Sequence, residues 1–270
     1  MDMRPKRFPT EGEHEAEVTT IFRSVNNTLG GSAMAKGNHK KVVYRVRGTY
    51  QNYQDYRVPS DDFTYNGFVL PLYERRLKNT AGQELHFSGT VGWQRNWGFT
   101  HLTVSNYAQK IGIFSGAIGI PRAYNLFHDG SHSNILTPRQ EINHFKASLN
   151  HQQVLGKHRL EIDAAFQHNN RLERSAPHTH TGVNTEKRSD LALQLILKTY
   201  SINTRWHTRF SEKINTTFGI QSQIQDNRIN GFEFLIPNFD SRTVGVFGLL
   251  NYHLKKKYTS ILVFVLRGAL

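Results

Sequence analysis

The chain has no cysteine among its 270 residues and no long apolar run. The absence of cysteine excludes disulfide frameworks, thiolate metal sites and cysteine nucleophiles. Its longest apolar run covers only residues 261–266, whereas a membrane-spanning helix needs about 20 mostly apolar residues. With 37% hydrophobic residues and a mean hydropathy of -0.55, the composition excludes a bundle of transmembrane helices. It does not exclude a β-barrel, because alternate residues of a barrel strand face the lumen and can be polar.

Negative charge is also scarce, since 34 Lys and Arg against 21 Asp and Glu give a formal net charge of +13. The basic residues are spread along the chain and are not gathered into a basic helix or an aromatic-interleaved patch, so we predict no nucleic-acid partner. Dispersed positive charge suits a surface that attracts anionic ligands or lipopolysaccharide phosphates. The sequence also lacks GxSxG, P-loop and HExxH signatures, and we therefore predict neither enzymatic activity nor a cofactor.

The sequence does contain side-chain alternation with a period of two, which is the pattern of half-buried strands. About eleven segments of roughly 9 to 20 residues show it between residue 15 and residue 270, and none sustains the i, i+3, i+4, i+7 spacing of an amphipathic helix. Residues 189–209 begin with helix formers, but the β-branched and aromatic run at 199–202 favours a strand. The clearest alternating segments are residues 44–51, 84–93, 159–167, 191–197 and 244–254.

Connections between these segments alternate between short and long. Outer-membrane β-barrels have tight periplasmic turns and long outer loops, so this order favours a barrel over a soluble sandwich. Most prolines lie in the long connections, as expected of loops, because proline cannot donate to a strand ladder. The short connections are residues 37–40, 94–96, 155–157 and 211–213, and the long ones are residues 54–82, 110–138, 172–187 and 228–240.

Several stretches resemble strands and loops of one protein family, in the same order along the chain. The stretches are residues 22–31, 43–50, 56–59, 103–107, 118–122, 138–142 and 235–239. They resemble the N-terminal half of the barrel of a TonB-dependent outer-membrane receptor of the kind common in Bacteroidetes. The resemblance implies a 22-stranded barrel with an N-terminal plug that imports ferric siderophores, haem, cobalamin or glycans with energy delivered through TonB.

By this resemblance, the chain is an all-β fragment: an antiparallel transmembrane β-barrel with about 11 of the family's 22 strands. We expect residues 1–14 to be disordered or to form a plug-to-barrel junction, and residues 15–270 to form the partial barrel without a plug. Residues 1–10 show no secretory signal pattern. An incomplete barrel leaves strand edges unpaired, and each unsatisfied backbone group costs several kcal/mol in hydrocarbon. We therefore expect that this polypeptide alone is not a working transporter.

The function implied by the resemblance is uptake of siderophore-iron or a similar scarce nutrient at the cell outer membrane. The implied partners are outer-membrane lipid and lipopolysaccharide, a small ligand such as a ferric siderophore, and the TonB-ExbB-ExbD system of the full-length family member. Two alternatives stay open: a small passive outer-membrane pore, and a soluble extracellular β-protein that binds carbohydrate or surface partners.

Candidate ligand contacts are basic and histidine side chains in the predicted outer loops. Imidazole is a common ligand of transition metals, but loop histidines and arginines are more often simply solvated, and we predict no metal site. Aromatic residues near strand ends are expected at the membrane interfaces, where aromatic girdles lie. The loop candidates are Arg122, Arg139, His128, His132, His178 and His180, and the interface candidates are Tyr50, Tyr53, Trp93, Trp97 and Tyr107.

Overall fold

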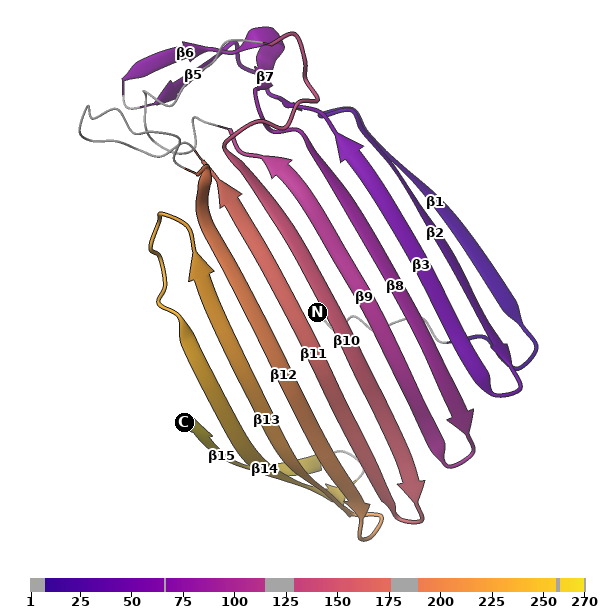
Figure 1. Ribbon diagram of the computed structural model, residues 1–270. Helices are drawn as coiled ribbons and strands as arrows, with labels where there is room; N and C mark the ends of the chain where they lie inside the picture. Colours follow the sequence, from indigo (N-terminus) through magenta and orange to yellow (C-terminus); the bar gives the residue numbers. More distant parts are fainter. Residues whose placement is uncertain (1–7, 66, 115–128, 176–188, 256–257, 270) are drawn as a thin grey trace.

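The computed structural model describes residues 8–65, 67–114, 129–175, 189–255 and 258–269, and most of them belong to one antiparallel sheet (Figure 1). Eleven strands follow one another across this sheet in chain order, and the predicted all-β wall of about eleven strands is confirmed. The strands are β1 (His14–Arg23), β2 (Thr28–His39), β3 (Val42–Tyr53), β8 (Gly82–Arg95), β9 (Gly98–Gly112), β10 (Arg139–Leu155), β11 (His158–Arg174), β12 (Leu191–Arg209), β13 (Ile214–Asn230), β14 (Phe239–Lys255) and β15 (Tyr258–Ala269).

Strand β12 is the element whose sequence also suited a helix. It runs for 19 residues and pairs with β11 on one side and β13 on the other along most of its length. These two ladders satisfy most of its backbone groups, and this outweighs the weak helix propensity of its leucine-rich start. The predicted strand at 189–209 therefore differs from the observed one by two residues at its start.

Short turns join the strands at one end of the sheet, and long connections join them at the other. Lys40 and Lys41 form the β2–β3 turn with φ values of +49° and +69°, as a two-residue hairpin turn requires. The first long connection has its own structure: β4 (Tyr56–Arg57) pairs with β7 (Arg76–Leu77), β5 (Asp62–Tyr65) pairs with β6 (Phe68–Pro71), and a 3₁₀ turn, η1, covers Tyr73–Arg75. Figure 1 shows these elements beyond the ends of the long strands.

The register of the sheet sorts its side chains onto two contrasting faces. Directly opposed residues of neighbouring strands point to the same side, so Val91, Leu102 and Leu149 share one face. We call this the apolar face; it also carries Val46, Leu85, Phe87, Ile202, Ile220 and Val244. The opposite side, the polar face, carries Arg45, Thr90, Thr103, Ser148, Asp163 and Asn203.

The apolar face is exposed: Leu102, near its middle, leaves 44% of its surface accessible. Within the described part of the chain no second layer packs against these side chains, and an apolar surface of this extent marks an interface with a membrane or another protein. On β8 the apolar positions run from Leu85 to Trp93. At about 3.4 Å per residue and a barrel tilt of 35–45°, these span roughly 20 Å along the membrane normal, close to the ~25 Å band of outer-membrane barrels.

Among the described residues, no helix is long and apolar enough to cross a membrane.

Candidate functional site

Three of the predicted interface aromatics lie on or beside the apolar face. Tyr50 is paired with Leu85 toward the loop end, and Trp93 is paired with Val42 next to the short turns. Trp97 lies in the β8–β9 turn and is exposed, while the Arg95 guanidinium stacks 3.9 Å from the centre of the Trp93 ring. These aromatic side chains therefore flank the apolar band at its two ends.

Tyr53 and Tyr107 lie elsewhere, because their side chains belong to the polar face. Tyr53 follows Tyr50 by three positions, and an odd spacing within a strand reverses the face. Its hydroxyl donates to the Glu84 carboxylate at 3.2 Å, and Tyr107 pairs across the strands with His86. The structure thus differs from the interface position predicted for these two residues.

The polar face is crossed by networks of charged and amide side chains. Around Glu84, the amides of Gln51 and Gln109 donate to the carboxylate at 2.8 and 3.0 Å. A second network lies on β10, β11 and β12. There the Arg205 Nε lies 2.9 Å from Glu161 Oε2, and the Arg205 Nη2 lies 2.5 Å from Asp163 Oδ2. A face of this composition can contact water, a polar solute or a polar protein segment.

The segment that leads into β1 lies against this same polar face. The centroids of the Phe8 and His101 rings are 5.2 Å apart. The Arg45 guanidinium lies 4.6 Å from the centroid of the Phe8 ring. The Gly12 amide donates to the Asn38 carbonyl at 2.8 Å. Residues 8–13 are therefore held on the polar side of β2, β3 and β9.

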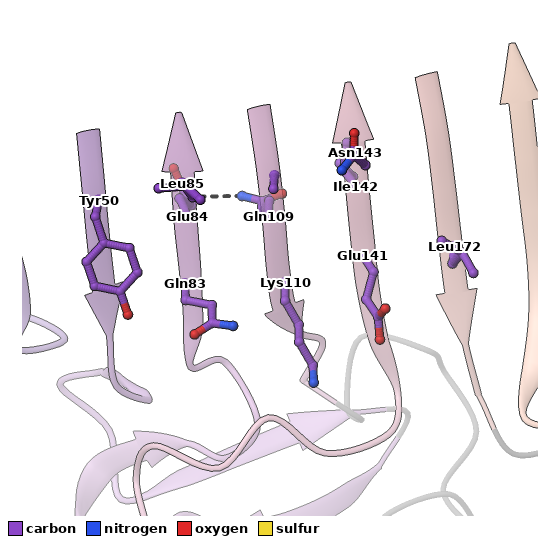
Figure 2. Close-up of a pocket in the computed structure, with 11 residues that line it drawn as sticks. Tyr50, Gln83, Glu84, Leu85, Gln109, Lys110, Glu141, Ile142, Asn143 and Leu172 are labelled. Carbon is purple, nitrogen blue, oxygen red and sulfur yellow. Dashed lines mark hydrogen bonds between the residues drawn. The ribbon is translucent and has the colours of Figure 1, made fainter. Parts of the chain in front are cut away.

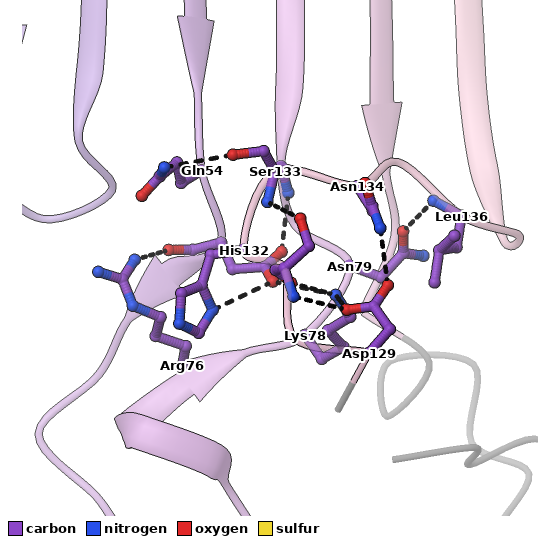
Figure 3. A network of polar contacts seen from close by, with 12 residues as sticks. Gln54, Arg76, Lys78, Asn79, Asp129, His132, Ser133, Asn134 and Leu136 are labelled. Carbon is purple, nitrogen blue, oxygen red and sulfur yellow. Dashed lines mark hydrogen bonds and ion pairs between the residues drawn. The ribbon is translucent and has the colours of Figure 1, made fainter. Parts of the chain in front are cut away.

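At the loop end, a network of polar contacts that includes Lys78, Asn79 and Asp129 ties the long connections together (Figure 3). A buried carboxylate, that of Asp55, belongs to the same network. Asp55 has no accessible surface, and its Oδ1 accepts hydrogen bonds from the amides of Thr80 at 2.8 Å and Ala81 at 3.2 Å. Its Oδ2 lies 3.8 Å from Lys78 Nζ and 3.9 Å from His132 Nδ1. Burial raises the pKa of Asp55, and the two amides and the Lys78 charge oppose that shift.

Two neighbours of Asp55 connect this first connection to the segment before β10. Lys78 Nζ donates to Asp129 Oδ1 at 2.6 Å and to the Ser131 carbonyl at 2.5 Å. The Asn79 amide nitrogen donates to the carbonyls of Ile113 and Pro138 at 2.9 and 2.7 Å. Hydrogen bonds from Lys78 and Asn134 hold the pKa of Asp129 well below its usual range. We call this network the loop cluster; its members are Asp55, Lys78, Asn79, Asp129 and His132.

Two of the predicted loop contacts are described, and both lie at the loop end. His132 belongs to the loop cluster, and its Nε2 lies 2.7 Å from Glu74 Oε2. Arg139 begins β10 and donates from Nε to Glu141 at 2.8 Å. The structure does not bring the two into one site. The remaining candidates, Arg122, His128, His178 and His180, lie outside the described residues.

Among the described residues, no group of three or more histidine, aspartate or glutamate side chains is arranged to hold a metal ion. Sequence reasoning also missed Asp55, Lys78 and Asn79, which build the loop cluster. They stand in a predicted loop without a recognisable spacing, and only the fold brings them to Asp129, 51 residues beyond Lys78.

No family model matches the sequence, and no curated protein matches it. A similar solved structure is that of the copper transporter OprC, with a TM-score of 0.59 and 10% sequence identity. The match covers 98% of this chain and 43% of that chain, so this chain spans less than half of the length of OprC. At this identity the likeness shows the fold alone, which is a partial antiparallel transmembrane β-barrel with short turns and long loops.

Proposed function

We propose that the chain is a section of the wall of an outer-membrane importer of the TonB-dependent receptor type. The observation that carries this proposal is the two-faced sheet, in which Leu102 and its neighbours present a continuous apolar face while the other side is lined by hydrogen-bonded polar networks. Such a sheet is stable where one face meets lipid and the other faces a lumen. The similarity to a copper transporter supports a role in transport.

The proposed cargo is siderophore-iron or a similar scarce nutrient, captured by the outer loops. Support comes from the loop end, where the loop cluster ties the first long connection to the segments that follow β9 and precede β10. His132 and Arg139 are proposed ligand contacts there, together with Arg122, His128, His178 and His180. In the full-length protein, we propose that energy comes from the TonB-ExbB-ExbD system.

Single-cysteine labelling tests the arrangement directly, because the sequence contains no cysteine. Leu102→Cys and Thr103→Cys are adjacent on β9 and belong to opposite faces, which makes them a matched pair. We expect a membrane-impermeant maleimide to label Thr103→Cys and to leave Leu102→Cys unlabelled in membranes. Equal labelling of both in a detergent-free extract would show a soluble β-protein and overturn the proposal.

The ends of the sheet give a second readout in whole cells. Ser133→Cys, in the loop segment, should react in intact cells, whereas Lys157→Cys, in the β10–β11 turn, should react only after the outer membrane is permeabilised. The opposite pattern would contradict the proposed orientation. If cells still took up the proposed cargo, siderophore-iron, after their proton motive force was collapsed, the result would favour a passive pore over an energised importer.

A further inference from the structure

A pocket of about 380 Å³ opens on the apolar face where β3, β8, β9, β10 and β11 approach the loops (Figure 2). Two rows of side chains on this face line it. The row nearer the middle of the sheet comprises Tyr50, Leu85, Ala108 and Asn143, which are opposed in register from β3 to β10. The row nearer the loops comprises Gln83, Lys110, Glu141 and Leu172.

The pocket owes its depth and its polarity gradient to these two rows. The Ala108 side chain lies between Leu85 and Asn143 and is only a methyl group, so it leaves an open space between these larger neighbours. The apolar side chains lie mainly on the membrane side, and the polar ones on the loop side. Figure 2 shows the side chains of Tyr50 and Lys110 extending toward the loop end. This gradient matches an amphiphile whose headgroup lies at the level of the loops.

The charges at the rim leave one cation available. The Glu141 carboxylate is occupied by Arg139, with Nε at 2.8 Å, and by Arg174, with Nε at 3.6 Å. Arg174 also bonds to Asp190 at 2.6 Å. Lys110 has no hydrogen-bond or ion-pair partner among the described residues. Three basic and two acidic side chains therefore give the rim a surplus positive charge at Lys110.

We infer that this pocket binds the phosphorylated sugar headgroup of an outer-leaflet glycolipid, the lipid A part of lipopolysaccharide. The inference rests on the proposed function, which places the loop end at the outer leaflet. Lys110 would pair with a phosphate, since an ammonium is a good point-charge partner for a phosphate oxygen. The Tyr50 hydroxyl and the Gln83 and Asn143 amides would bond to sugar hydroxyls, and Leu85 would contact the first methylenes of an acyl chain.

The experiment measures the glycolipid that the native protein retains. The protein containing this chain is purified in mild detergent from its own outer membrane, and bound lipid A is quantified by mass spectrometry per mole of protein. Lys110→Gln should lower the retained lipid A about fivefold, because one surface cation near anionic lipid contributes about that factor. Lys198→Gln is the matched control, since Lys198 is an exposed cation on the same face outside the pocket. Ala108→Phe, which fills the hollow, should also lower retention.

Equal retention by Lys110→Gln and Lys198→Gln would overturn the inference, because it would mean that lipid adsorbs by general charge alone. If Lys110→Gln weakened the binding of inorganic phosphate to the purified protein but retained all of its lipid A, the inference would also be overturned, and the pocket would be a site for free anions. Labelling of Ser133→Cys in intact cells, before the protein is purified from them, separates the two proposals. If that residue is exposed on intact cells while retention does not depend on Lys110, the inference fails and the proposed function stands. If it is not exposed, the proposed function itself fails.

Discussion

Replacement of Asp55 with alanine should release the loop cluster from the end of the sheet. Asp55 is fully buried, and its loss removes the acceptor for two backbone amides, those of Thr80 and Ala81, at 2.8 and 3.2 Å. A buried donor left without a partner costs about 1–3 kcal/mol, so the loss of the acceptor for two donors should lower the local opening free energy by roughly 2–6 kcal/mol. That range corresponds to about 30- to 20,000-fold more frequent opening, since 1.4 kcal/mol is a factor of ten.

Hydrogen exchange of the purified protein in detergent would measure this effect at the Thr80 and Ala81 amides. Asp55→Asn retains an acceptor oxygen and should lose less protection than Asp55→Ala, which separates hydrogen bonding from charge. Asp61→Ala is the control, because Asp61 forms an exposed ion pair with Arg75 at 2.7 Å, and exposed pairs contribute little. Similar exchange in Asp55→Ala and Asp61→Ala would refute the argument that the buried carboxylate holds this loop.

Three further results are expected. Gly98→Ala should destabilise the β8–β9 turn by about 1–3 kcal/mol, because φ is +154° and a Cβ would overlap the backbone of β10, whereas Gly48→Ala, with open space around it, should have little effect on thermal unfolding. Leu102→Arg should cost about 2–4 kcal/mol of folding stability in lipid vesicles, and equal losses for Leu102→Arg and Thr103→Arg would contradict the assignment of the faces. Because the pKa of Asp129 is lowered in the folded protein, its ionised carboxylate stabilises the loop above pH 3.8, the usual pKa of aspartate. This stabilisation is lost as the pH falls below 3.8 toward the lowered pKa. Protease resistance of the wild-type loop should therefore approach that of Asp129→Asn in acid.

The strands and the order of turns and loops could be predicted from the sequence because both follow from local requirements. A strand between lipid and a polar space must alternate, and the segment at residues 84–93 shows this directly within β8. The same alternation also fixes which face a residue occupies once one neighbour is known. Tyr50 and Tyr53 could therefore have been separated by parity alone, because three positions along a strand reverse the face.

The loop cluster could not be predicted in the same way. Lys78 and Asp129 are 51 positions apart, and their contact depends on how two long connections fold over the strand ends. Nothing in the local sequence distinguishes Asp55 from an ordinary loop aspartate. Its burial follows from the surrounding chain, which supplies the amides of Thr80 and Ala81 at the right distance. Contacts of this kind depend on the folded conformation of the long connections and leave no periodic pattern in the sequence.

The loop cluster and the neighbouring β5–β6 hairpin should differ in mobility, and this bears on ligand capture. Asn79 ties the cluster to backbone carbonyls at the ends of β9 and β10, so it should open rarely. The hairpin has four-residue strands and carries the exposed Val69, and its contacts with the rest include a Phe63–Phe114 ring contact at 5.2 Å. Elements with few buried contacts open at lower free energy. Under the proposed function, a ligand arriving from outside would meet both the loop cluster and a hairpin that opens more readily. We then expect ligand-dependent exchange protection to be concentrated in β5 and β6.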